Sequence, residues 1–236
     1  MKKNLLAAKF VGILKEGLSF PVTYFLSLFP YELSWKGEGV PLLLIHGYLN
    51  SSLVWFYHGN RFHKRGLGPI YTVFLGKPFC SIREYAKKVE EKVGQIQRET
   101  KKKEIILMGH SMGGIVAAYY ALKLAHEVNV RAILTMGSPF HGTKVAKIAF
   151  GECAHEMAPC SLLLKEIEDA RKKNPKIPFY CIATSLDHIV VPPSSALMGE
   201  DPHKEAVLDS CGHASLLFSK EANEQMIQWA TDFRFE

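Results

Sequence analysis

One stretch near the middle of the chain decides the fold: Glu104-Ile105-Ile106-Leu107-Met108-Gly109-His110-Ser111-Met112-Gly113-Gly114. It begins with a continuous apolar run, which is typical of a strand buried on both faces of a parallel sheet. The residues from Gly114 to His126 are nearly all apolar, as in a helix packed against such a sheet. The stretch therefore predicts a strand, a tight turn and a helix in direct succession.

Outward from this stretch, short apolar runs alternate with helical patterns. Strands are expected at residues 40–45, 69–75, 104–108, 130–136 and 179–184, with a weaker one at 205–208. Helices are expected at 82–96, 114–126, 161–172 and 222–230, and Ser81 with Glu84 forms a capping box before the first. This alternation predicts an α/β fold with a doubly wound, mostly parallel sheet of about six strands. The long connection at 141–178 is expected to form a short helical cap over the carboxyl ends of the strands.

Composition is that of an ordinary soluble globular domain. The 236 residues carry a net charge of +6 that is spread along the chain, and no recognition motif accompanies the run Lys101 to Lys103. A nucleic-acid partner is therefore not expected. Five cysteines without a CxxC pair argue against a disulfide scaffold and against a zinc site. Cys153 and Cys160 could pair across a short loop in an oxidising compartment.

The N-terminus differs from the rest of the chain. Residues 1–36 are interpreted as an apolar and basic arm, and residues 37–236 as the domain. The first residues resemble a signal peptide, but charges interrupt the apolar run and no clean cleavage site follows, which favours a cytoplasmic or membrane-associated location. The uncharged stretch 17–31 is too short to span a membrane, and Pro21 and Pro30 are expected to break it. Residues 1–31 are then either an interfacial anchor that contacts a membrane peripherally or a helix on the domain's own surface.

The turn after the central strand carries the pattern G-x-S-x-G, from Gly109 to Gly113. Between a strand and a helix this pattern is typical of a nucleophile elbow, in which both glycines leave room where a side chain would collide. The helix that begins behind Ser111 favours developing negative charge. Ser111 is therefore the candidate nucleophile, although a glycine-rich turn with an incidental serine would give the same pattern.

The remaining parts of a hydrolytic site are expected at the ends of other strands. The amide of Met112 is one predicted oxyanion donor, and the amide of Tyr48, with Leu49 as the alternative, is the other. His46 is expected to brace that loop through hydrogen bonds. Asp187 follows a strand directly and His213 follows the last one, which makes them the candidate acid and base.

Other residues compete for these roles or add to them. Asp209 is the rival acid, but it sits too close in sequence to His213 to face it easily. Leu49, Trp55, His110 and Phe140 are the candidate substrate-binding residues, and for Trp55 an ordinary core position is an equally open interpretation.

These motifs together resemble the lipase/esterase branch of the α/β-hydrolase superfamily, and within it bacterial triacylglycerol lipases and related deacylases. They are His46-Gly47-Tyr48, Gly109 to Gly114, Gly137-Ser138-Pro139-Phe140-His141-Gly142-Thr143, the Asp187 segment ending in Val191-Pro192, and Gly212 to Leu217. The resemblance covers roughly residues 37 to 235 and implies a minimal α/β-hydrolase fold, a Ser-His-Asp triad, an acyl ester or lipid substrate, and neither metal nor cofactor. Two departures are residues 1–36, which lie outside the pattern, and the lack of the usual hairpin before the strand that ends at His46.

Three functions fit these residues. The first is hydrolysis of carboxylic esters through an acyl-enzyme. The second is a thioesterase or acyltransferase on the same triad, and the third a non-catalytic ligand-binding scaffold, which an intact triad disfavours. If residues 1–31 are an anchor, a chain that begins near Glu32 should still fold and cleave short soluble esters.

Overall fold

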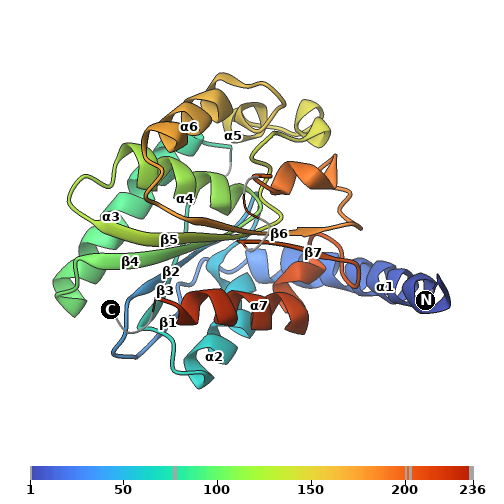
Figure 1. Cartoon of the computed structure of the whole chain (residues 1–236), viewed down its shortest axis with the longest axis horizontal. Helices are drawn as coiled ribbons and strands as arrows, with labels where there is room; N and C mark the ends of the chain where they lie inside the picture. Colours follow the sequence, from blue (N-terminus) through green and yellow to red (C-terminus); the bar gives the residue numbers. More distant parts are fainter. Residues whose placement is uncertain (1, 77–78, 200, 202–203, 234–236) are drawn as a thin grey trace.

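The structure is a computed structural model that describes the backbone of residues 2–76, 79–199, 201 and 204–233, with side chains from residue 9 onward in those ranges. A central sheet carries helices on both faces (Figure 1). Its strands are β1 Ser34–Trp35, β2 Leu42–Ile45, β3 Ile70–Val73, β4 Glu104–His110, β5 Asn129–Met136, β6 Phe179–Thr184 and β7 Glu205–Leu208. Their order is β1-β3-β2-β4-β5-β6-β7. All neighbouring pairs are parallel except β1 with β3, which confirms the predicted doubly wound, mostly parallel α/β fold.

The strand that sequence reasoning missed is β1. It pairs antiparallel with β3, and Ser34 and Trp35 lie opposite Tyr71 and Ile70. The end of the predicted arm thus belongs to the sheet, and it supplies an antiparallel edge before β2. Two residues are too few to carry a period-two pattern, so the sequence gives no signal for this strand.

Two layers of helices enclose the sheet. The longer ones are α2 Phe56–Lys64, α3 Ile82–Thr100, α4 Met112–Lys123, α6 Leu162–Lys173 and α7 Lys220–Thr231. Helices α3, α4 and α6 cover one face and share one apolar core, whereas α2 and α7 cover the other face (Figure 1). The predicted capping box is confirmed, because the Ser81 hydroxyl accepts the amide of Glu84 and the Glu84 carboxylate accepts the amide of Ser81.

The connection at 141–178 contains η2 Lys144–Lys147, α5 Glu152–Glu156 and α6. The apolar face of α6, with Leu163, Leu164 and Ile167, is buried in the same core as α4. Helix α6 is therefore the crossover helix between β5 and β6, and η2 and α5 pack against the same core through Ala146 and Cys153. The helical period of residues 161–172 identified the helix correctly, but it could not tell which surface the helix covers.

The first helix, α1 Lys2–Ser27, runs through Pro21 without a break, contrary to the prediction. Two hydroxyl groups, one on either side of the proline, donate to main-chain carbonyls of the same helix: Ser19 to Lys15, and Thr23 to Phe20. No helix in the described part of the chain is long and apolar enough to cross a membrane.

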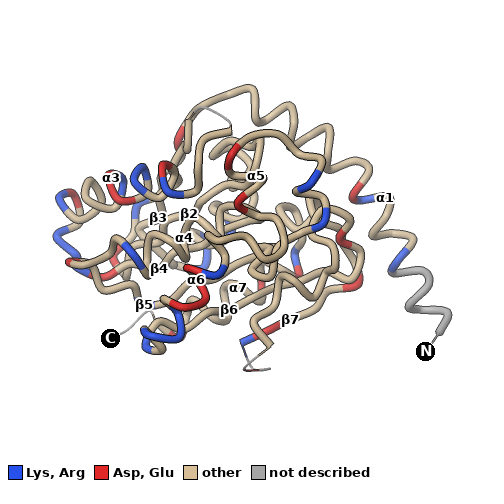
Figure 2. Tube along the Cα trace, turned by 90° about the horizontal axis from the view of Figure 1, so that it is seen from above, with Lys and Arg blue, Asp and Glu red and all other residues tan. Residues whose placement is uncertain are grey.

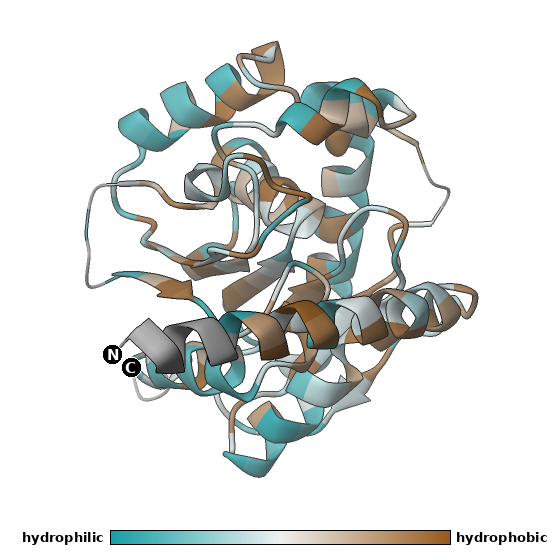
Figure 3. Cartoon of the chain, turned by 90° about the vertical axis from the view of Figure 1, so that its right-hand side faces the viewer, coloured by the Kyte–Doolittle hydropathy of each residue, from teal (hydrophilic) through white to brown (hydrophobic). Residues whose placement is uncertain are grey.

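The two faces of α1 are reversed in polarity compared with an ordinary surface helix. The buried positions are Gly12, Glu16, Ser19 and Thr23, which are small or polar. The exposed positions are largely apolar, and they include Phe10, Val11, Ile13, Leu14, Leu18, Phe20, Val22, Tyr24 and Phe25. Leu28 and Phe29, just after the helix, are also exposed. Figure 3 shows α1 crossing one side of the molecule, with much of its described length in the apolar colour. Beyond Glu16 the helix carries no charge, whereas Figure 2 shows both signs of charge interspersed along α3.

Candidate active site

Ser111 lies in the sharp turn between β4 and α4. Its backbone has φ 55° and ψ −127°, a conformation that residues with a side chain rarely adopt. A Cβ at Gly109 would collide with the backbone of Gly114, and a Cβ at Gly113 with the carbonyl of Ile45. The predicted strand, tight turn and helix are confirmed, and both glycines are required by close backbone contacts.

The loop after β2 passes directly against this turn. A Cβ on Gly47 would be 2.9 Å from the Cβ of Ser111, so the amides that follow Gly47 lie beside the candidate nucleophile. His46 Nε2 accepts the amide of Leu75 at 3.1 Å, which leaves Nδ1–H to donate to the carbonyl of Gly47 at 2.9 Å. Burial lowers the pKa of His46 to about 4, so the ring is neutral. The predicted bracing role of His46 is confirmed.

The side chain of Tyr48 points away from the turn. Its hydroxyl donates to the carbonyl of Phe150 at 2.7 Å and so links this loop to the η2–α5 segment. Any contribution of Tyr48 to an oxyanion hole therefore comes from its main chain, as predicted. Leu49, the alternative donor, has φ 54°.

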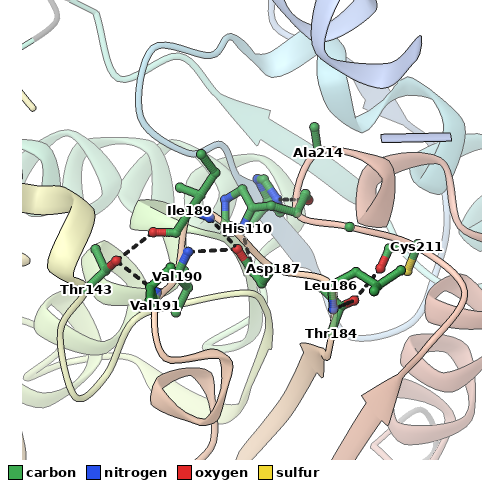
Figure 4. A network of polar contacts seen from close by, with 12 residues as sticks. His110, Thr143, Thr184, Leu186, Asp187, Ile189, Val190, Val191, Cys211 and Ala214 are labelled. Atoms are coloured by element: carbon green, nitrogen blue, oxygen red, sulfur yellow. Dashed lines mark hydrogen bonds and ion pairs between the residues drawn. The ribbon is translucent and has the colours of Figure 1, made fainter. Parts of the chain in front are cut away.

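Asp187 and His213 come together from the loops after β6 and β7. Nδ1 of His213 donates to Oδ2 of Asp187 at 2.8 Å, and both side chains are buried. The other carboxylate oxygen accepts the amides of Ile189 at 2.9 Å and Val190 at 2.7 Å (Figure 4). Asp209 instead accepts the hydroxyl of Ser185 at an exposed position. The carboxylate that faces His213 is thus that of Asp187.

Two threonines hold these loops, and sequence reasoning missed both. The Thr143 hydroxyl donates to the carbonyl of Ile189 at 2.6 Å and accepts the amide of Val191 at 3.0 Å (Figure 4). The Thr184 hydroxyl donates to the carbonyl of Cys211 and accepts the amide of Leu186 at 3.2 Å. Thr143 closes the motif that begins at Gly137, which is the one signal that could have found it.

His110 is buried next to His213. Its Nε2–H donates to the main-chain carbonyl of His213 at 3.0 Å, and the two ring centroids are 4.8 Å apart. Burial, together with the neighbouring His213, holds the pKa of His110 well below its usual range. Its Nδ1 has no hydrogen-bond partner among the described residues. A neutral His110 therefore supports the main chain of the candidate base.

A pocket of about 240 Å³ opens beside Ser111 and His213. Its wall includes the predicted residues Tyr48, Leu49 and His110 together with Phe20, Thr23, Tyr24, Asn50, Ile189, Ala214 and Leu217. The residues from α1 were not predicted, because nothing in the local sequence indicates which distant loops a helix will meet. The covering role expected of residues 141–178 falls to α1 at this pocket.

Two predicted substrate-binding residues lie elsewhere. Trp55 is fully buried in the core between the sheet and α2, and Phe140 packs edge-on against Phe179 in the opposite core. Both predictions are wrong for the same reason: a large apolar ring next to a site motif is stabilised most by burial away from water. For Trp55 the core interpretation holds.

The described residues contain neither a disulfide nor a cluster of metal ligands. All five cysteines are free, with Cys153 buried in α5 and Cys160 exposed. The described residues contain no group of three or more His, Cys, Asp or Glu side chains that could hold a metal ion.

The sheet, the strained turn at Ser111 and the Asp187–His213 pair together have the arrangement of an α/β hydrolase. Solved structures share this fold at low sequence identity. The mature lipase BlEst2 of Bacillus licheniformis has a TM-score of 0.68 at 16% identity and covers 87% of this chain and 99% of its own. Lipase B of Aspergillus fumigatus has a TM-score of 0.68 at 14% identity, over 84% of this chain and 54% of its own.

More specifically, the chain belongs to the family of PGAP1-like alpha/beta domains, whose profile matches residues 62–236. A GPI inositol-deacylase of Candida albicans is 29% identical over 123 aligned residues, which cover 43% of this chain and 31% of that protein. The chain thus matches about a third of the length of this curated relative.

Proposed function

We propose that this chain hydrolyses carboxylic acyl esters, with Ser111 as nucleophile, His213 as general base and Asp187 as its partner. The observation that carries the proposal is that a strained serine and a carboxylate-bound histidine face one pocket. Because Nδ1–H of His213 is donated to Asp187, Nε2 is left to accept the proton of the serine hydroxyl.

The reaction then has two halves. Ser111 Oγ attacks the ester carbonyl carbon while its proton passes to His213, and the amides of Met112 and Tyr48, with Leu49 as the alternative to Tyr48, hold the resulting oxyanion. The intermediate collapses, the alcohol leaves with the proton from His213, and the acyl group remains on Ser111. Water, deprotonated by His213, attacks the acyl-enzyme and releases the carboxylic acid.

The ester is proposed to be a lipid that is met at a membrane surface. The outer face of α1 exposes large apolar side chains such as Leu18 and Phe25, and contiguous patches of this kind mark partner surfaces. A lipid surface is favoured over a protein partner because the same helix lines the pocket through Phe20 and Tyr24. A bilayer against that face therefore meets the helix that forms the pocket wall. The relative's name makes an acylated inositol lipid the first natural substrate to test.

Enzymatic function is tested with a fluorophosphonate probe and a p-nitrophenyl ester series from C2 to C16. Wild-type protein should be labelled and should hydrolyse at least part of the series, whereas Ser111→Ala should do neither. Labelling of Ser111→Ala equal to wild type would reject the assignment. If the wild-type protein is labelled by the probe but cleaves thioesters in place of oxygen esters, the function is that of a thioesterase. If it is labelled and transfers the acyl group to an acceptor other than water, the function is that of an acyltransferase.

Membrane contact is tested separately with the double variant Leu18→Glu, Phe25→Glu. Both residues are exposed on α1 and outside the pocket wall, so hydrolysis of a short soluble ester should be unchanged. Co-sedimentation with anionic vesicles and hydrolysis of emulsified long-chain ester should fall at least about tenfold, since each introduced charge opposes burial in lipid. Leu162→Glu is the matched control, because Leu162 is an equally exposed leucine on α6. Equal loss in the control would contradict a specific role for α1.

A further inference from the structure

Glu16 is a buried carboxylate in the middle of the inward face of α1. Its side chain is 3% exposed. One oxygen accepts the amide of Ala214 at 2.8 Å, and the other accepts the amide and the hydroxyl of Ser215 at 2.9 Å and 2.7 Å. A helix nearly two hundred residues away in sequence thus holds the two residues that follow His213.

The loop around His213 is shaped for this contact. Ser215 Oγ, while donating to Glu16, accepts the amide of Gly212 at 2.7 Å. A Cβ on Gly212 would lie 2.5 Å from the carboxyl carbon of Glu16, so the helix can approach only because that residue is glycine. Glycine before the candidate base therefore serves the contact with α1.

Three groups fix His213 from three directions. Asp187 binds its ring, His110 binds its main-chain carbonyl, and Glu16 binds the amides of the next two residues. Burying a carboxylate is unfavourable unless hydrogen bonds compensate, and here three donors converge on it. If position 16 only packed α1 against the domain, an apolar side chain there would stabilise the contact better.

We propose that Glu16 is a positioning residue for the candidate base, and that α1 is therefore part of the catalytic centre. The inference rests on the proposed esterase function. It replaces the expectation that the domain would act on soluble esters without its N-terminal arm. Removing α1 takes away both Glu16 and the pocket wall at Phe20 and Tyr24.

The test is Glu16→Gln in the full-length chain, with p-nitrophenyl butyrate as a soluble substrate. A glutamine amide turns an N–H₂ group toward at least one of the donors that Glu16 accepts, so the loop must shift. Displacing a catalytic group slightly costs rate rather than affinity, so kcat should fall roughly a hundredfold while KM stays within about twofold. The proton NMR resonance of the His213 Nδ1–H shared with Asp187 should shift or broaden. Ser19→Ala is the matched control, because Ser19 is buried on the same face and donates to Lys15 within its own helix.

A second variant guards against simple unfolding. Ser215→Ala keeps the two amide donors and removes one hydroxyl, so it should fold and lose about three- to tenfold in kcat. The double variant should lose little more than Glu16→Gln alone, because both changes break one contact network. Full kcat with an unshifted resonance in either folded variant would overturn the proposal. Failure of the wild type to hydrolyse the ester or react with the fluorophosphonate would instead reject the esterase function itself.

Discussion

Replacing Asp187 by asparagine tests the proposed acid most sharply, because the structure fixes which way the new amide must face. The Oδ1 atom of Asp187 accepts two main-chain amides, from Ile189 and Val190, and Oδ2 accepts His213 Nδ1–H. In Asp187→Asn the amide oxygen will keep the two main-chain donors, and the N–H₂ group will face His213. The ring then accepts at Nδ1 and carries its proton on Nε2, where it cannot deprotonate Ser111.

The expected loss of kcat follows from the free energy needed to turn the asparagine so that its amide oxygen faces His213. Turning the asparagine over leaves the buried amide of Val190 and the partly buried amide of Ile189 without acceptors, at about 1–3 kcal/mol each, or about 2–6 kcal/mol in total. At about 1.36 kcal/mol per tenfold, this lowers kcat roughly 30-fold to 10⁴-fold. Loss of the negative charge beside the imidazolium adds to the barrier, so we expect a loss of about 10³ to 10⁴, in line with the same change in a serine protease.

The assay is kcat for p-nitrophenyl butyrate, with a thermal melt to show that each variant is folded. In Asp187→Asn the side chain still accepts the hydrogen bonds from the amides of Ile189 and Val190, so the melting temperature should stay close to that of the wild type. The matched control is Asp209→Asn, whose parent carboxylate is exposed and bound to Ser185, and it should change kcat by less than about threefold. More than a tenth of wild-type kcat in Asp187→Asn, or the larger loss in Asp209→Asn, would refute the reasoning.

Three further predictions can be checked with the same protein. Ser111→Ala and His213→Ala should each lower kcat by about four to six orders of magnitude, and the double variant should lose little more. A double variant whose fold-loss in kcat equals the product of the two single fold-losses would contradict a shared role. Tyr48→Phe should change kcat by less than about threefold, because the phenol binds the carbonyl of Phe150 rather than the pocket; a tenfold loss would show that the hydroxyl takes part. Burial lowers the pKa of His46 and of His58 to about 4, against 6.5 when unfolded, so the unfolded chain binds more protons between these values. The free energy of unfolding should therefore be highest above pH 6.5 and should decrease toward pH 4 by about 1.4 kcal/mol per pH unit for each histidine. Equal free energies of unfolding at pH 7.5 and pH 5, measured by chemical denaturation, would contradict this.

The sequence alone determined the framework of the fold. Continuous apolar runs at β2, β4, β5 and β6 mark strands buried on both faces. A capping box and an apolar period mark α3, a nearly all-apolar run marks α4, and helical patterns mark α6 and α7. The turn at Ser111 was readable because glycine spacing between a strand and a helix is a local signal of a tight, strained backbone. Local patterns of this kind depend on neighbours in the chain, so they survive without tertiary information.

The predicted pairing of His213 with Asp187 rested on position in the chain. Both residues follow strands of a parallel sheet, whose carboxyl ends meet at one edge, so chain order alone limited the choice to few residues. The same reasoning failed for Trp55 and Phe140, since being adjacent to a motif does not decide whether a ring faces the pocket or the core.

Only the tertiary structure decided the role of the N-terminal helix. Its sequence predicted an apolar arm broken at Pro21, yet α1 is continuous and turns Glu16, Ser19 and Thr23 inward. Glu16 meets Ala214 and Ser215 because folding brings together segments that are far apart in sequence, and no periodicity within either segment encodes that meeting. Hydrophobic patterning predicts which residues leave water, but a polar group is buried only where the folded chain supplies its hydrogen-bond partners.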